Sequence, residues 1–283
     1  MSAQHGLDTA GGEGRGVAGL LAPSRKAAIL DELAAAGTVV VRALSVRLEV
    51  SEMTIRRDLI ELEAEGRLRR IHGGALPVAY LPPAAMDSEE PSFASRLRRQ
   101  QEGKEAIAAK AAELVARYRT IALDVGTTTF LMTPHLRSLA HAKIFTNSLR
   151  IAAALDGAAP DIYVAGGLVR ADEMSTYGPA AVAQFEPLWF DVAVIGVSGV
   201  TPEGLFDYSV EDAELKRVYL RRSGVRIVLC DASKFQRMSL VNIGALAQVN
   251  ILVTDAPPPP ALAAVLAASG IDVRIAGSSD ARA

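Results

Sequence analysis

The second half of this chain of 283 residues alternates short apolar runs with amphipathic stretches, and this alternation limits the fold more than any other feature. The apolar runs have the length and composition of strands that are buried on both faces. They cover residues 120–124, 143–146, 161–165, 192–196, 226–231 and 250–255. Helical patterns separate most of them, over 130–139, 149–155, 210–222 and 260–268. The alternation predicts an α/β domain with a mostly parallel sheet, in which a ligand binds at the carboxyl ends of the strands.

The amino-terminal part of the chain has a different pattern, that of three short helices. Residues 25–36 predict a first helix that turns Ile29 and Leu33 inward, and a short second helix follows it. Ser51 is the expected N-cap of a third helix over 52–65, which buries one apolar face. The residues expected to project outward from this helix are Thr54, Arg56, Arg57 and Asp58.

This third helix has the geometry of a DNA-recognition helix, whose first turns read base edges in the major groove. Residues 67–74 predict a hairpin wing with arginines that attract phosphate whatever the base sequence. Helical spacing alone suits a plain three-helix bundle with surface arginines equally well. The expected DNA contacts are Ser51, Thr54, Arg56, Arg57, Arg69, Arg70 and His72.

Composition shifts divide the chain into four parts. Residues 1–23 predict a disordered tail, and residues 24–76 an all-α winged helix-turn-helix domain with its short wing. Residues 77–91 contain four prolines and predict a linker. A long helix is expected from Ser92 onward, and it opens an α/β domain over 92–277.

The first predicted strand runs into a turn that suits an anion. Residues 124–129, Asp-Val-Gly-Thr-Thr-Thr, place free backbone N–H groups and three hydroxyls before a helix. Phosphate is the expected anion, although a plain helix N-cap has the same composition. The turn matches neither the P-loop nor the dinucleotide fingerprint, so ATP and NAD are poor candidates.

Small or polar turns also follow the later strands, and their coincidence predicts one shared crevice. Each turn alone is ordinary loop chemistry. Lys234 after the fifth strand is a candidate partner for phosphate. The acidic stretch around Lys216 suits a solvated first helical turn equally well. The expected effector contacts are Asp124, Gly126, Thr127, Thr128, Thr129, Asn147, Gly166, Gly167, Gly196, Glu211 and Lys234.

One string carries a specific resemblance. Residues 51–66, Ser-Glu-Met-Thr-Ile-Arg-Arg-Asp-Leu-Ile-Glu-Leu-Glu-Ala-Glu-Gly, followed by Arg-Ile-His-Gly-Gly-Ala over 70–75, closely resemble the helix-turn-helix signature of the DeoR family of bacterial regulators. The resemblance implies a carboxy-terminal domain related to phosphosugar isomerases and deaminases. It also implies that a phosphorylated sugar binds at matching positions, namely Asp124, Gly126, Thr127, Thr128, Asn147 and Lys234. Val125 departs from the family pattern, which commonly has serine there.

Composition excludes several other classes of protein. A net charge of −2 argues against a protein that coats nucleic acid without specificity. Cys230 is the single cysteine, and neither a membrane-spanning run nor a secretion signal is present, so we expect a cytoplasmic protein that is nucleoid-associated when bound to DNA. The histidines show no metal-ligand spacing, so no metal and no cofactor are expected.

The first functional hypothesis is a regulator, by resemblance a repressor of a sugar or polyol utilisation operon. A sugar-phosphate effector would control its binding to double-stranded operator DNA, and a homodimer or homotetramer would present paired DNA-binding heads. The rival hypothesis is a phosphosugar isomerase with a DNA-binding head. Its candidate proton-transfer residues are Asp207, Glu211, Asp231 and Lys234.

Overall fold

The computed structural model describes residues 22–36, 39–71, 73–78, 85–86 and 89–277. Contacts within the chain form two compact units, Met1–Tyr80 and Leu81–Ala283. Their boundary falls inside the segment 77–91 that the sequence predicts as a linker. Nearly all of the predicted tail, and His72, lie outside the described residues.

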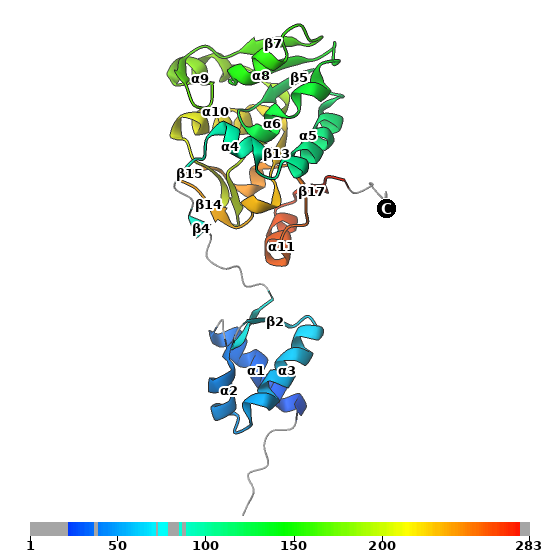
Figure 1. Cartoon of the computed structure of the whole chain (residues 1–283), viewed down its shortest axis with the longest axis vertical. Helices are drawn as coiled ribbons and strands as arrows, with labels where there is room; N and C mark the ends of the chain where they lie inside the picture. The colour runs from blue at the N-terminus through cyan, green and yellow to red at the C-terminus, as the bar shows by residue number, and fades with distance from the viewer. Residues whose placement is uncertain (1–21, 37–38, 72, 79–84, 87–88, 278–283) are drawn as a thin grey trace, which may run out of the picture. The chain divides into compact units, whose positions relative to one another are not determined.

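The amino-terminal unit packs three helices against a small antiparallel sheet of strand order β1-β3-β2 (Figure 1). The predicted wing is the β2–β3 hairpin. Its elements are α1 (Ala22–Ala36), β1 (Val39–Val40), α2 (Val41–Arg47), α3 (Glu52–Ala64), β2 (Leu68–Ile71) and β3 (Gly74–Pro77). Ile29, Leu44, Ile55 and Leu62 meet in one fully buried core, as helical spacing predicted for α1 and α3.

Two details of α3 matter for its exposed face. Ser51 caps the helix, because its hydroxyl accepts a hydrogen bond from the Thr54 backbone N–H at 3.1 Å. The prediction that Asp58 projects outward was wrong, since it is 2% exposed. Its carboxylate accepts two hydrogen bonds from Arg25, at 2.5 and 3.0 Å, and so joins α3 to α1. A buried charge is stable only when it is paired in this way.

The carboxy-terminal unit is built on a seven-stranded sheet of order β17-β16-β13-β10-β5-β6-β7, in which every neighbouring pair is parallel. The prediction of a mostly parallel α/β domain is confirmed. Its strands are β5 (Thr120–Leu123), β6 (Lys143–Thr146), β7 (Asp161–Val164), β10 (Phe190–Gly196), β13 (Ser223–Leu229), β16 (Ile251–Thr254) and β17 (Asp272–Ile275). The chain builds the sheet outward in opposite directions from β5 and β10, which makes this pair the switch point of the topology.

Helices cover both faces of this sheet, because successive side chains of each strand point to opposite sides. In β10, Val192 and Val194 face the core under α5, whereas Ala193 and Ile195 face the core under α10. The helices are α4 (Phe93–Arg98), α5 (Gln101–Val115), α6 (Thr127–Phe130), α7 (Thr133–Leu136), α8 (Leu149–Ala154), α9 (Pro179–Phe185), α10 (Val210–Arg221) and α11 (Pro260–Ala268). This α/β/α layering leaves the carboxyl ends of the strands free to form a site.

Two predicted helices are interrupted. The long helix expected from Ser92 is divided into α4 and α5, because Gln100 adopts a left-handed φ of 51° between them. The helix expected over 130–139 is replaced by the short α6 and α7.

Smaller strands join the rim of the sheet. They are the β8–β9 hairpin (Leu168–Arg170, Ser175–Tyr177), a sheet of β11 (Gly199–Thr201), β12 (Gly204–Asp207) and β15 (Val241–Gly244), and β4 (Ala85–Met86) paired with β14 (Arg237–Met238). The β4–β14 pair ties the second half of the predicted linker to the carboxy-terminal unit. The described part of the chain also contains two 3₁₀ turns, Ala232–Lys234 and Leu246–Gln248.

Candidate functional site

A polar pocket lies at the carboxyl ends of β5, β10 and β13, at the switch point of the sheet. This is the place where open α/β sheets bind their ligands. Its floor includes the turns after these strands, at Gly126, Gly196 and Asp231. Its walls are strongly charged, with side chains from well-separated segments of the chain. The charged lining residues are Glu90, Arg96, Lys104, Glu173, Asp207, Asp212, Lys216, Asp231 and Lys234.

Lys216 on α10 is the central charge of the pocket. Its ammonium donates hydrogen bonds to the Asp124 carboxylate and, at 2.8 Å, to the Gly196 carbonyl, and Asp207 lies 3.0 Å away. Burial opposes its charge, but the two carboxylates outweigh burial and raise the pKa of Lys216. Complete burial raises the pKa of Asp124 to about 7, although the ammonium acts against this rise. The cluster therefore supplies the counter-charge of Lys216 internally.

Two other lysines of the pocket form no such ion pair among the described residues. Among the described residues, neither Lys104 on α5 nor Lys234 after β13 forms an ion pair with a carboxylate, and Lys104 donates to the Arg96 carbonyl. Burial lowers the pKa of Lys104 to about 8 and also lowers the pKa of Lys234. Asp231 partly opposes both shifts. Cations held in a poorly solvated pocket attract an anion, because an anion restores the balance that burial removed.

The close approach of α5 to the sheet explains how Lys104 reaches the pocket. Gly103 precedes it and lies against Asp255, at the end of β16. A Cβ atom at residue 103 would stand 2.4 Å from a carboxylate oxygen of Asp255, so a larger residue would have to displace that side chain or the helix. The glycine therefore allows the close approach of α5 to the end of β16.

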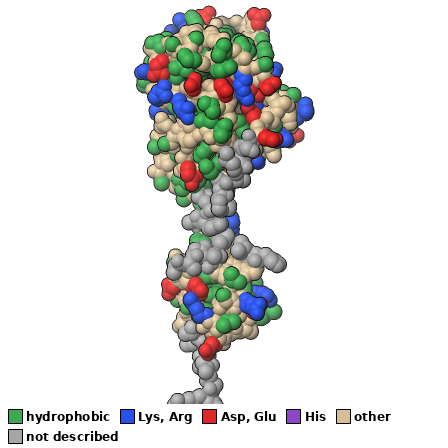
Figure 2. All heavy atoms as spheres, turned by 90° about the vertical axis from the view of Figure 1, so that its left-hand side faces the viewer, with side chains coloured by type: hydrophobic (Ala, Val, Ile, Leu, Met, Phe, Trp, Pro, Cys, Tyr) green, Lys and Arg blue, Asp and Glu red, His purple; other side chains and the backbone are tan. Residues whose placement is uncertain are grey.

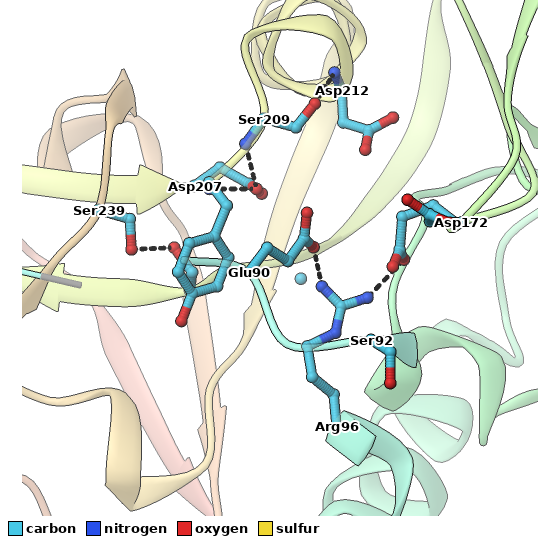
Figure 3. A network of polar contacts seen from close by, with 12 residues as sticks. Glu90, Ser92, Arg96, Asp172, Asp207, Ser209, Asp212 and Ser239 are labelled. Atoms are coloured by element: carbon cyan, nitrogen blue, oxygen red, sulfur yellow. Dashed lines mark hydrogen bonds and ion pairs between the residues drawn. The ribbon is translucent and has the colours of Figure 1, made fainter. Parts of the chain in front are cut away.

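A second charged network borders the pocket, and Figure 3 shows the Arg96 side chain reaching toward Glu90. Arg96 also bonds to Glu173. Glu90 bonds in turn to Arg170, whose second nitrogen lies 2.6 Å from Asp212. These five groups form one chain of alternating charges, and all but Arg170 line the pocket.

The structure brings some of the predicted effector contacts together. Gly126, Thr127, Thr128, Gly196 and Lys234 line one pocket, although they come from three different strand ends. The isomerase candidates Asp207 and Asp231 line it as well.

Other predicted contacts lie away from the pocket surface for identifiable reasons. Asp124 is fully buried beneath it on Lys216. Asn147 accepts a hydrogen bond from the Tyr219 hydroxyl at 3.2 Å and donates one to the Thr176 carbonyl at 3.3 Å. The remaining four bond or pack locally: Thr129 to the Gly126 carbonyl, Gly166 to Gln184, Gly167 against the Tyr177 carbonyl, and Glu211 to Ser209.

Sequence reasoning missed Arg96, Lys104, Glu90 and Glu173 as pocket residues. The helix pattern after Ser92 was visible, but nothing local shows that its first turns cross the carboxyl edge of the sheet. Lys216 was noted only as part of an acidic stretch. Its position on the buried face of α10 was the available signal, because a buried lysine requires a carboxylate partner.

Two classes of site receive no support from the described residues. No group of three His, Cys, Asp or Glu side chains among them is arranged to hold a metal ion. Of the helices that the structure describes, none combines the length and apolar character needed to span a bilayer.

The amino-terminal unit presents the first turns of α3 to solvent. Arg57 is exposed and has no ion-pair partner among the described residues, whereas Arg56 bonds to Glu52 at 2.8 Å. Thr54 is half-buried and shares a 2.9 Å hydrogen bond with the Ser51 hydroxyl. Met53, 67% exposed, adds an apolar contact surface that sequence reasoning did not include.

The wing arginines differ in the same way. Arg69 is exposed and forms no ion pair within the described part of the chain, but Arg70 bonds to Glu63 at 2.8 Å through both its backbone and its side chain. Figure 2 shows acidic and basic side chains on both units. The unpaired arginines of α3 and the wing are thus the available phosphate contacts.

Comparison with known families gives matches in both units. The DeoR-like helix-turn-helix domain matches residues 25–78, and the DeoR C-terminal sensor domain matches residues 99–256. The glycerol-3-phosphate regulon repressor of Escherichia coli K12 is 32% identical over 240 residues, which are 84% of this chain and 92% of the relative.

Further comparisons agree. The transcriptional regulator GolR of Listeria innocua is 31% identical over 84% of this chain and 92% of its own length. The transcriptional repressor GlcR of Bacillus subtilis is 29% identical over 89% of this chain and 95% of its own length. Ribose 5-phosphate isomerase A of Methanocaldococcus jannaschii is 17% identical over 48% of this chain and 55% of that one, with a TM-score of 0.34, which is too low to support a conclusion. The two matched domains and the relatives named as repressors and regulators show that this chain is not an isomerase but a DNA-binding transcription regulator of the DeoR family.

Proposed function

We propose that this regulator is a repressor whose pocket binds the phosphate group of a small sugar or polyol phosphate. The observation that carries the proposal is a pair of lysines, the buried Lys104 and the half-buried Lys234, that face one pocket without ion-pair partners among the described residues. A phosphate dianion would compensate both charges, and a neutral sugar would not.

The lining of the pocket suits both parts of such a ligand. Lys104, Lys234 and the turn at Thr127 offer positive charge and donors for a phosphate. The Asp207–Lys216 ion pair, which also lines the pocket, offers acceptors and donors that suit hydroxyl groups. The names of two relatives refer to glycerol 3-phosphate and to transcriptional repression, and they guide the choice of ligands to test.

The domain limits remain as the sequence predicts them, 24–76 for the DNA-binding domain and 92–277 for the sensor. The proposed DNA contacts are Ser51, Thr54, Arg56, Arg57, Arg69 and Arg70, with His72 outside the described residues. We place the protein in the cytoplasm, on the nucleoid when it binds DNA.

A homodimer or homotetramer is proposed because paired heads match paired half-sites on DNA. The open edge of the sheet supports this assembly. Among the residues that the structure describes, edge strand β7 has a sheet neighbour on one side only. Apolar side chains on β7 and β8 are exposed, namely Tyr163, Val164, Leu168 and Val169.

Fluorescence anisotropy of labelled upstream DNA tests the proposal. The purified protein is titrated with glycerol 3-phosphate, other sugar phosphates and their unphosphorylated parents. We expect one phosphorylated compound to change DNA affinity and its parent to have no effect. If DNA binds but no compound changes its affinity, the pocket assignment fails. If DNA never binds, the proposed DNA contacts fail.

A further inference from the structure

The segment that leads into the carboxy-terminal unit is held at two places next to the pocket. Strand β4 pairs with β14, with Ala85 opposite Arg237, and β14 follows closely after Lys234. Further along, Glu90 lines the pocket itself. Residues of the segment between the two units, β4 and Glu90, are therefore attached to the carboxy-terminal unit beside and within the lining of the pocket.

Glu90 already pairs with two arginines, of which Arg96 lines the pocket. One carboxylate oxygen accepts from Arg96 and the other from Arg170. Glu90 and Arg96 are each only 14% exposed at their side chains, so water competes weakly for this pair. Arg96 and Lys104 are joined as well, because the Lys104 ammonium donates to the Arg96 carbonyl.

An incoming phosphate would meet Glu90 as a rival anion. A phosphate near Lys104 lies within the same pocket as the Arg96 guanidinium, and phosphate forms bidentate charge-assisted hydrogen bonds with guanidinium groups. Two anions in contact in a poorly solvated site repel each other strongly. Glu90 carries one negative charge and a phosphate dianion carries two, so the phosphate is the stronger competitor for Arg96.

We propose that Glu90 is an internal competitor of the effector, and that a phosphate bound to Arg96 and Lys104 displaces it and loosens the segment that leads to the DNA-binding unit. The inference rests on the proposed function, because it requires the pocket to take a phosphate group. The coupling is reciprocal: if phosphate displaces Glu90, then the ion pairs that hold Glu90 in place weaken phosphate binding by the same factor.

The experiment uses the full-length protein and inorganic phosphate as the probe. Isothermal titration calorimetry compares the wild type with Glu90→Gln, and the matched control is Glu89→Gln, which changes an exposed neighbour. Glu90→Gln is expected to bind phosphate about tenfold more tightly, whereas Glu89→Gln matches the wild type. Hydrogen exchange of the backbone amides of residues 85, 86, 89 and 90 should accelerate with phosphate in the wild type, and should be fast without phosphate in Glu90→Gln.

The other outcomes each decide a question. Equal phosphate affinity in Glu90→Gln and the wild type, or an equal gain in both variants, overturns the competition while the proposed function stands. Absence of phosphate binding in all three proteins overturns the proposed function and this inference together. If Glu90→Gln does not fold, Glu90→Asp keeps the charge but is one methylene shorter, and an affinity no higher than that of the wild type overturns the inference.

Discussion

At the scale of single residues, the protonation of Lys104 is expected to control effector binding. Burial lowers its pKa to about 8, and a lysine is charged only below its pKa. Phosphate monoesters have a second pKa of about 6, so their charge is constant above neutral pH. Phosphate affinity should therefore fall by up to about tenfold for each pH unit above about 8.

Calorimetry at a series of pH values measures this dependence. Lys104→Gln should bind phosphate weakly and lose most of the dependence, with Lys234 supplying the remainder. Lys110→Gln is the matched control, because Lys110 lies on the same helix but pairs with Glu113 outside the pocket. A Lys104→Gln profile as steep as that of the wild type would contradict the assignment.

Lys216 has a different role at this scale, since it is the shared cation of two buried carboxylates, Asp124 and Asp207. Lys216→Met leaves Asp124 and Asp207 without their cation and should destabilise the protein by about 3 to 5 kcal/mol. Urea denaturation followed by circular dichroism measures the loss. Adding Asp124→Asn should restore part of the stability, because it removes one uncompensated charge.

Lys234→Met is the control for this prediction. Lys234 has no ion-pair partner among the described residues, so its removal should change stability by less than about 1 kcal/mol. Equal losses in Lys216→Met and Lys234→Met would show that the Lys216 cluster has no special role in stability.

At the scale of the element, the exposed side of α3 determines what the amino-terminal unit can read. Arg57→Ala should weaken operator binding by about 1 to 3 kcal/mol, since its guanidinium is free to contact DNA. Arg56→Ala should have an effect in the same range, reduced by the few tenths of a kcal/mol that Arg56 loses when it leaves Glu52. Anisotropy with labelled operator measures both, and phosphate affinity serves as the control that should not change. Wild-type operator affinity in both variants would reject α3 as the reading helix.

Helices and strands were predictable from the sequence where a single local pattern of apolar residues determines them. The run over 143–146 matches β6, and the pattern over 260–268 matches α11, residue for residue. The break at Gln100 was not predictable, because a left-handed residue is usually glycine or asparagine and neither is present there. The inward turn of Asp58 depends on Arg25, which lies on another helix.

The same distinction separates the predicted and the missed parts of the pocket. The turns at Gly126 and Gly196 were predictable, because each directly follows its own strand. The Lys216–Asp124 pair joins residues far apart in the chain, and the Glu90–Arg170 pair does so as well. Such contacts depend on tertiary packing, which local spacing does not encode.

At the scale of the whole molecule, assembly is expected to depend on the open edge of the sheet. An unpaired edge strand with apolar neighbours favours pairing with another chain unless charged residues prevent it. Leu168→Glu places a charge among the exposed side chains of β7 and β8, where Leu168 is 63% exposed. Light scattering after size exclusion should show a multimer for the wild type and a smaller species for the variant, with weaker operator binding because paired heads are lost. Leu240→Glu, at a residue of similar exposure outside β7 and β8, should leave both properties unchanged. If Leu168→Glu keeps the wild-type mass, the subunits associate through another surface.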